Sequence, residues 1–197
     1  MENIFIKGEK INLRPPTNAD AEFYSSRLND PEIREALFLA LPTGVELQEE
    51  KLCEYSKSEN TVVFTIVDKN SNKAVGQTAL FRIDYINGNA VFFLAILDSD
   101  YWSLGLGSEA TKLMMRYAFD TLNLNRIQLH VYSENKPAIR IYNAVGFKKE
   151  GVLRQAMFRS GAYHDFWVMG MLKREWQRYK KKQEKHGRTQ RSRKSVS

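Results

Sequence analysis

Gly105 and Gly107 stand one residue apart, directly before a segment with the apolar spacing of an amphipathic helix. The first backbone N–H groups of a helix have no intrahelical partners and lie at the positive end of its dipole. Glycine adopts positive φ and lets an anionic group approach the backbone closely. The spacing therefore predicts a phosphate-binding loop. From the glycines alone, a turn that binds no ligand is an equal alternative.

Residues 105–110 also fit the dinucleotide pattern G-x-G-x-x-A. A Rossmann turn follows its strand at once, whereas residues 98–104 separate the apolar run 90–97 from Gly105. The strands before this loop read as antiparallel hairpins, and the P-loop pattern G-x-x-x-x-G-K-[ST] is absent. A nicotinamide dinucleotide is therefore a distant alternative ligand.

Two side chains downstream of the loop have acid–base chemistry. His130 shares the polar face of a predicted strand, residues 126–132, and imidazole titrates closest to neutral pH. Tyr142 lies on the apolar side of a predicted helix, residues 136–145, so spacing alone favours a core tyrosine. Asn135 precedes that helix and is a candidate for its cap.

The remaining elements form a frame for these residues. Alternation, apolar runs and turn signals predict strands near 11–14, 61–67, 74–84 and 90–97, and a final hairpin over 147–172. Asn87-Gly88 predicts a tight turn between two of the strands. Helices are expected after Thr17, after Pro31 and over 46–58. This order indicates a mixed α/β (α+β) sheet in one domain.

The 197 residues carry a formal charge of +7, which comes from the end of the chain. Residues 173–197 contain 11 Lys/Arg and 2 Asp/Glu, so they carry +9 and leave −2 for residues 1–172. The single cysteine, Cys53, excludes an internal disulfide, and we expect it to be a buried, inert thiol. The chain has neither a long apolar run nor a signal-peptide pattern, so we expect a cytoplasmic protein without membrane insertion.

Several segments of the sequence resemble the motifs of a known protein family. "YWSLGLGSEA" is similar to the pyrophosphate-binding motif Q/R-x-x-G-x-G/A of the GNAT superfamily of acetyl-CoA-dependent N-acetyltransferases. "SENKPAIRIYNAVGFKKEGVL" resembles the Asn–helix–Tyr–Gly–Phe segment of that superfamily. With "LRPPTNADAEFY" and "FRSGAYHDFWVMGMLKREW", the chain is most similar to the RimJ/RimL-like branch of ribosomal-protein alanine and polyamine acetyltransferases, over about residues 9–176.

The resemblance implies a GNAT fold, a mixed and mostly antiparallel twisted sheet of about seven strands with helices on both faces. We expect the GNAT domain to cover residues 1–176 and a basic, disordered tail to cover residues 177–197. A homodimer is plausible from the family alone. No metal is expected, because transfer from a thioester to an amine requires none, and no His/Cys/carboxylate cluster has ligand spacing.

The resemblance also implies roles for individual residues. Backbone N–H groups along the pantetheine arm would polarise the thioester, and a loop would cradle the pyrophosphate. Asn135 would contact CoA, and Tyr142 would protonate the departing thiolate. His130 stands five residues before Asn135, where some relatives place a catalytic glutamate, so it is the candidate base; ordered water and Glu134 are alternatives. The strand end is Ala95, Ile96 and Leu97, and the loop is Ser103, Leu104, Gly105, Leu106, Gly107 and Ser108.

Two positions depart from the family pattern. Trp102 stands where Gln or Arg is usual, although Trp is familiar in this branch. Polyamine-acetylating relatives carry a glutamate near Val91 or Phe92, and both positions are apolar here. Because a cationic substrate favours a nearby carboxylate, this weakens a polyamine assignment.

We therefore expect an enzyme that moves an acetyl group from acetyl-CoA to a primary amine by direct transfer in a ternary complex. The acceptor would be a protein N-terminus, an amino acid, an amino sugar or another small amine. Polyamine acetylation is one alternative. A non-catalytic acyl-CoA-binding module is another, tethered by the basic tail to RNA, the ribosome or an anionic membrane.

Overall fold

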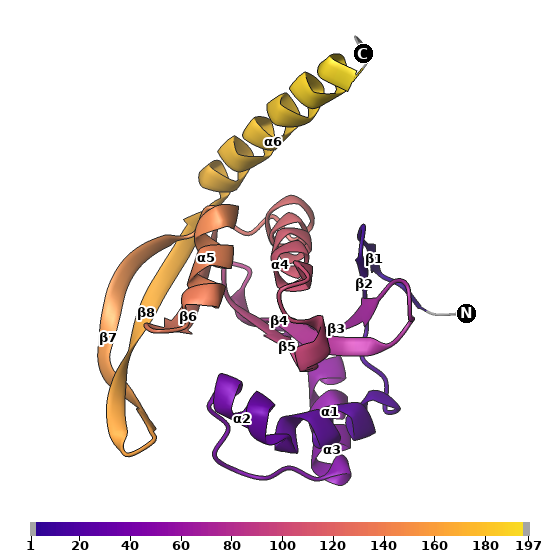
Figure 1. The fold of residues 1–197 in the computed structure, drawn as a ribbon, viewed down its shortest axis with the longest axis vertical. Helices are drawn as coiled ribbons and strands as arrows, with labels where there is room; N and C mark the ends of the chain where they lie inside the picture. Colours follow the sequence, from indigo (N-terminus) through magenta and orange to yellow (C-terminus); the bar gives the residue numbers. More distant parts are fainter. Residues whose placement is uncertain (1–2, 195–197) are drawn as a thin grey trace.

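The computed structural model describes the backbone of residues 3–194 and the side chains of residues 3–185. Over that range, eight strands form one mixed sheet. The same range contains six α-helices, and helices lie on both faces of the sheet (Figure 1). The strands are β1 (Ile6–Lys7), β2 (Ile11–Arg14), β3 (Val62–Asp68), β4 (Ala74–Asp84), β5 (Asn89–Ile96), β6 (Arg126–Tyr132), β7 (Lys148–Arg159) and β8 (Ala162–Leu172). The helices are α1 (Asp20–Asn29), α2 (Pro31–Leu37), α3 (Val45–Lys57), α4 (Leu106–Arg116), α5 (Lys136–Val145) and α6 (Lys173–Lys194).

The strand order is β1-β2-β3-β4-β5-β6-β8-β7, and every neighbouring pair is antiparallel except β5–β6. A parallel pair needs a crossover connection, which α4 and the π-helical turn Tyr117–Thr121 supply. The mixed, mostly antiparallel sheet predicted from the sequence is confirmed. The strand number is eight rather than seven, because β1 is a two-residue strand paired with β2 and is too short to give a periodic signal.

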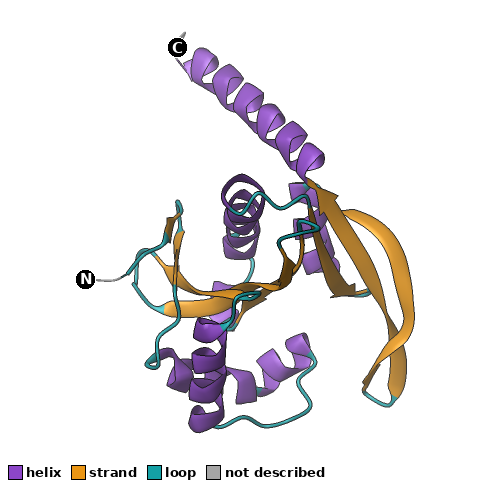
Figure 2. Cartoon of the chain, turned by 180° about the vertical axis from the view of Figure 1, so that it is seen from behind, coloured by secondary structure: helices purple, strands orange, loops and turns teal. Residues whose placement is uncertain are grey.

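Helices lie on both faces of the sheet (Figure 2). Two hydrophobic clusters hold them there. On one face, α4 and α5 pack on strand side chains that include Ala90, Phe92, Ile127, Leu129 and Val131. On the other face, α1, α2 and α3 pack on the alternate side chains of β5, which include Phe93 and Ala95. The period-two alternation of β5 therefore divides its side chains between the two layers.

The central parallel pair separates along its length. β5 and β6 pair only from Asn89–Val91 to Arg126–Gln128. Beyond that point β5 continues to Ile96 and β6 to Tyr132 without pairing to each other. This stretch, residues 92–96 facing residues 129–132, is called the β5–β6 opening below. It leaves backbone N–H and C=O groups in the middle of the sheet without a strand partner across it.

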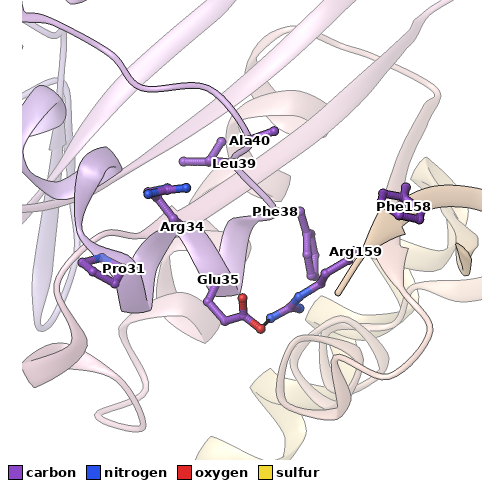
Figure 3. A pocket seen from close by; sticks show the side chains of 8 residues that line it. All are labelled: Pro31, Arg34, Glu35, Phe38, Leu39, Ala40, Phe158 and Arg159. Carbon is purple, nitrogen blue, oxygen red and sulfur yellow. Dashed lines mark ion pairs between the residues drawn. The ribbon is translucent and has the colours of Figure 1, made fainter. Parts of the chain in front are cut away.

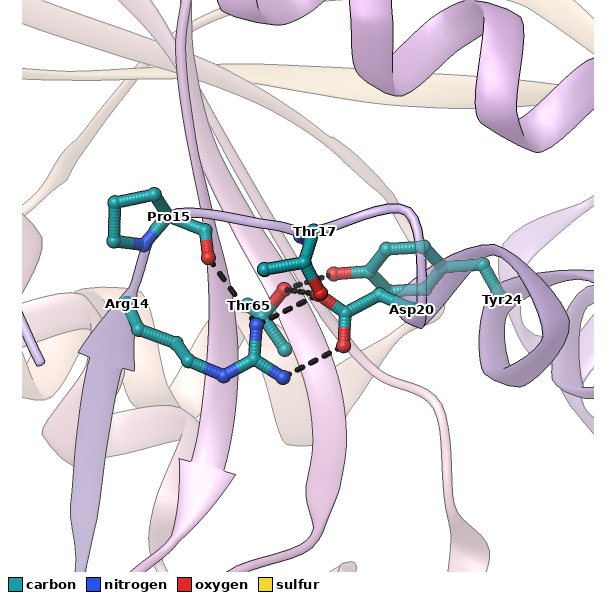
Figure 4. A network of polar contacts seen from close by, with 6 residues as sticks. All are labelled: Arg14, Pro15, Thr17, Asp20, Tyr24 and Thr65. Atoms are coloured by element: carbon teal, nitrogen blue, oxygen red, sulfur yellow. Dashed lines mark hydrogen bonds and ion pairs between the residues drawn. The ribbon is translucent and has the colours of Figure 1, made fainter. Parts of the chain in front are cut away.

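A polar network joins β2, α1 and β3 beneath the sheet (Figure 4). The Arg14 guanidinium donates two hydrogen bonds of 2.7 Å to the Asp20 carboxylate. The Thr17 N–H and the Thr65 hydroxyl donate to the same carboxylate at 2.8 and 3.1 Å. The Tyr24 hydroxyl lies 2.7 Å from the Thr65 hydroxyl. Each group is paired, so burying the charges leaves no unsatisfied partner among these five residues.

The structure corrects the expectation for Cys53, whereas the disorder of residues 177–197 stays a prediction. The backbone of residues 177–194 continues α6. Lysine, arginine, glutamine and glutamate are good helix formers, and no proline interrupts the segment; residues 195–197 lie outside the described part. Cys53 is exposed on α3 rather than buried, because α3 turns Gln48 and Leu52 inward instead.

No helix in the described part of the chain has both the length and the apolar character needed to cross a bilayer. α6 extends away from the sheet, with the C-terminal end of the chain at its far tip (Figure 1). Its first turns are held by Trp176, which is 2% exposed and stacks between Phe119 and Tyr179. Lys180 pairs with Asp120 at 2.8 Å.

Candidate active site

The predicted phosphate loop has a strained, open backbone at the start of α4. Ser103 has a φ of 62° and Gly105 a φ of 85°, both in the left-handed region. Successive residues in mixed-handed conformations turn their N–H groups into one concave surface that suits an anion. Ser103, Leu104 and Gly105 are exposed, and Gly105 is the residue at which α4 begins. These features fit a pyrophosphate held by backbone N–H groups.

The second glycine has a packing role. A Cβ on Gly107 would lie 3.3 Å from Ile141 Cδ1 of α5 and 3.6 Å from Leu94 Cδ2 of β5. Gly107 thereby lets α4, α5 and β5 approach one another at the mouth of the β5–β6 opening. Leu106 is buried and Ser108 is half-buried, so Leu106 anchors the loop in the core while the backbone faces outward.

Lys10 is a loop neighbour that the sequence analysis missed. Its ammonium donates to the Leu104 carbonyl at 2.9 Å and lies beside Gly105. The Glu109 carboxylate, in the first turn of α4, accepts from the Glu9 and Lys10 N–H groups at 2.5 and 3.1 Å. The turn between β1 and β2 is therefore fastened to α4, and it adds a positive charge where an anion would bind. No local pattern links Lys10 to a loop 94 residues away.

The hydrogen bonds of residues 95–97 limit which of their N–H groups are free to contact a thioester. The Leu97 N–H donates to the Val75 carbonyl of β4 at 2.8 Å. Because backbone groups of successive residues point to opposite sides in a ladder, Ala95 also faces β4, and Ile96 faces the β5–β6 opening. Leu97 therefore has no free N–H for polarising a carbonyl, which corrects the sequence-based role. Ile96 retains one.

Trp102, the departure from the family pattern, has a structural explanation. Its indole N–H donates to the Ile96 carbonyl at 3.0 Å. Its ring packs beside Ala95 and Leu97 in the cluster under β5. Trp102 therefore fixes the end of β5 and orients the Ile96 peptide at the opening.

Tyr142 and Asn135 are both positioned by α5. The Asn135 side chain accepts from the Ala138 N–H at 3.1 Å, so Asn135 is the helix cap that its sequence context indicates. Tyr142 is 8% exposed and packs edge-on against Phe92, with ring centroids 6.3 Å apart. Burial raises the pKa of the Tyr142 hydroxyl to about 12. No described residue hydrogen-bonds this hydroxyl, so it is a protonated donor without a competing partner.

His130 lies on the opposite side of β6 from Tyr142. Leu129 and Val131 share the core cluster of Tyr142, so His130 and Tyr132 project from the other face. His130 is exposed, and its imidazole forms no hydrogen bond with a described residue. The two candidate acid–base groups thus lie on opposite faces of the sheet at the β5–β6 opening.

A cavity of about 320 Å³ borders the layer that His130 faces (Figure 3). It lies between α2 and the end of the β7–β8 hairpin, and its lining was not predicted from the sequence. The lining residues are Pro31, Arg34, Glu35, Phe38, Leu39, Ala40, Phe158 and Arg159. Within the described residues, no three His, Cys, Asp or Glu side chains gather to hold a metal ion.

Comparison with known proteins shows to which protein family this chain belongs. The family profile of the acetyltransferase (GNAT) domain matches residues 10–148, which include the phosphate loop, His130 and Tyr142. The chain belongs to the GNAT acetyltransferase family. It falls in the RimJ/RimL-like branch and is an acetyl-CoA-dependent N-acetyltransferase.

Relatives of this GNAT enzyme include uncharacterised proteins and polyamine enzymes. The uncharacterised N-acetyltransferase p20 of Bacillus licheniformis is 30% identical over 179 residues, covering 89% of this chain and 99% of that protein. Spermidine N(1)-acetyltransferase of Escherichia coli K12 is 37% identical over 100 residues, covering 51% of this chain and 53% of that protein. The crystal structure of Vibrio cholerae spermidine N-acetyltransferase in complex with CoA and spermine has a TM-score of 0.79 at 26% identity, covering 86% of this chain and 99% of that one.

Proposed function

We propose that this chain transfers the acetyl group of acetyl-CoA directly to a primary amine, with both substrates bound together. The observation that carries the proposal is the β5–β6 opening, flanked by a phosphate-binding helix start and a protonated, unpartnered tyrosine. A thioester supplies the activated acetyl group. The protein has to bind it, polarise its carbonyl and manage two protons.

The proposal assigns each task to a residue. Backbone N–H groups of residues 103–108 and the Lys10 ammonium hold the pyrophosphate at the start of α4. The Ile96 N–H faces the opening and stabilises negative charge on the carbonyl oxygen. The Tyr142 hydroxyl donates its proton to the departing sulfur, because its raised pKa keeps it protonated at neutral pH. His130 accepts the proton of the amine from the opposite side.

Asn135 supports this arrangement through α5. By capping the helix it fixes the first turn and, two turns later, the position of Tyr142. A direct contact between Asn135 and CoA is part of the proposal and is compatible with the cap, because the amide N–H₂ of Asn135 remains available.

The acceptor is a small amine or a protein N-terminal amine. Polyamine acetylation is the alternative favoured by the names of the spermidine-acetylating relatives. Against it, Val91 and Phe92 supply no carboxylate, and Phe92 is 3% exposed in the core. A non-catalytic acyl-CoA-binding module is disfavoured by the retained Tyr142.

The test is acetyl transfer to a panel of amines. Purified protein is mixed with acetyl-CoA and an alanine-starting peptide, spermidine, amino acids or amino sugars, and both free CoA and the mass of the product are measured. An acetylated product formed together with CoA supports the proposal. Tight binding of acetyl-CoA without any acetylated product across the panel would favour the binding module.

A further inference from the structure

The cavity beside the acceptor face is built by one side of α2. Pro31, Arg34 and Glu35 lie at positions i, i+3 and i+4 of α2, so they share one helix face, and Phe38 follows as the left-handed C-cap residue. Across from them the end of β7 contributes Phe158 and Arg159 (Figure 3). The opposite side of α2 buries Ile33 in the core, which fixes the orientation of the lining.

The charges of this lining do not cancel. Arg159 forms an ion pair with Glu35, and its guanidinium lies 4.7 Å above the centre of the Phe38 ring. Glu35 is the one carboxylate among the lining residues, and this pair neutralises it. Arg34 makes no ion pair with a described residue. The uncompensated charge of the cavity is therefore positive and belongs to Arg34.

One lining residue of the cavity contacts β6 on the side that carries His130. The Phe38 ring contacts the Tyr132 ring edge-on, with centroids 5.0 Å apart. The His164 ring nitrogens lie 3.2 Å from the Tyr132 hydroxyl and 3.3 Å from the Arg159 carbonyl, which ties the hairpin to the end of β6. The cavity and the His130 side chain therefore lie on the same face of the sheet, near the end of β6.

We propose that the cavity holds the acceptor and that Arg34 binds a carboxylate on it, so that the substrate class is amino carboxylates rather than polyamines. The inference rests on the acetyl transfer proposed above. A guanidinium recognises a carboxylate through paired, charge-assisted hydrogen bonds. The rings of Phe38 and Phe158 cover the apolar part of the acceptor. A polyamine instead brings a second cation toward Arg34 and finds Glu35 already engaged by Arg159.

The experiment compares acceptors that differ only in charge. Alanine, glutamate and 4-aminobutanoate are each paired with the corresponding carboxamide, and spermidine is added. For the wild type, kcat/KM of the best acid should exceed that of its amide at least tenfold. Arg34→Gln should remove this preference, and Arg34→Glu should reverse it in favour of spermidine. Arg116→Gln, an exposed arginine on α4 outside the cavity, is the matched control and should keep the preference.

A second measurement separates this proposal from the transfer reaction. Ligand-observed NMR follows the same acids and amides in the presence of CoA-saturated protein, without turnover. Binding of an acid that is lost in Arg34→Gln supports the site even if no product forms, and the transferase proposal alone would then fail. Equal binding or turnover of acids and amides, a wild-type preference for spermidine, or no binding of any acid would overturn the inference.

Discussion

The two candidate acid–base residues, Tyr142 and His130, differ in burial. Tyr142 is enclosed by Phe92 and Phe147, and burial raises its pKa to about 12. Its hydroxyl therefore remains protonated throughout the pH range in which most enzymes are assayed. Loss of kcat between pH 8 and 10 should not come from Tyr142, so any alkaline limb in that range belongs to another group.

His130 is exposed, and its role rests on its place across β6 from Tyr142. We expect His130→Gln to lower kcat/KM at neutral pH about 100-fold, the lower range for general-base removal. Glu134→Gln, also exposed and four residues away, is the control and should change kcat/KM less than threefold. An unchanged kcat/KM in His130→Gln would contradict its role as the base and favour ordered water in that role.

At the level of elements, the approach of α4, α5 and β5 at Gly107 sets the shape of the site. Gly107→Val places methyl groups against Ile141 and Leu94, which should destabilise the fold by about 1–3 kcal/mol and weaken CoA binding. Gly151→Val in β7 is the matched control, because a Cβ there meets nothing within 4 Å. Denaturant unfolding and CoA titration measure both effects. Equal stability and CoA affinity in the two variants would contradict the packing argument.

The junction of β2 and α1 provides a pH-dependent element. Burial by itself raises the pKa of Asp20, but the Arg14 hydrogen bonds and charge and the Thr17 N–H outweigh it and lower the pKa. A lowered folded-state pKa gives stability that is present above the unfolded pKa of about 4 and is lost as pH falls through the folded value. Asp20→Asn should therefore cost about 3 kcal/mol at pH 7.

That cost should shrink as the pH falls toward 2, because the wild type loses the same contribution there. Urea unfolding at pH 7 and at low pH measures the difference. Glu59→Gln, on an exposed loop, is the control and should leave stability unchanged at both pH values. A constant difference between wild type and Asp20→Asn at every pH would exclude the ionised carboxylate as its cause.

Features that depend on neighbouring residues could be predicted from the sequence. Contacts between residues far apart in the sequence could not. The start of α4 at the paired glycines, the Asn87-Gly88 turn and the cap at Asn135 each depend on neighbouring residues. By contrast, Lys10 beside Leu104 and Arg159 beside Glu35 arise only when distant elements meet. The hydrogen bond from the Leu97 N–H to the Val75 carbonyl depends on the register between β4 and β5. The alternation of apolar residues in one strand does not specify that register.

For the whole molecule, α6 decides where the folded unit ends. The sequence-based boundary lies at residue 176, but Tyr179 stacks on Trp176 and Lys180 pairs with Asp120 beyond it. Truncation after Lys182 should change the free energy of unfolding by less than about 0.5 kcal/mol. Truncation after Gln177 removes both contacts and should cost about 1–2 kcal/mol.

Trp176→Ala should be more costly still, about 3–5 kcal/mol, because it leaves a cavity beside Phe119. Denaturant unfolding ranks the three variants. If truncation after Lys182 abolished folding or small-amine acetylation, the basic tail would be part of the catalytic domain rather than an extension of it.

The central claim is that this GNAT enzyme transfers acetyl groups with Tyr142 as the acid. The measurement is the rate of acetyl transfer by Tyr142→Phe beside the wild type, on the best acceptor of the panel, with acetyl-CoA affinity measured in parallel. Phenylalanine keeps the ring that packs against Phe92 and removes only the hydroxyl. We predict that kcat falls at least 100-fold while the acetyl-CoA affinity changes less than threefold. An unchanged kcat in Tyr142→Phe, with normal acetyl-CoA binding, would contradict the account.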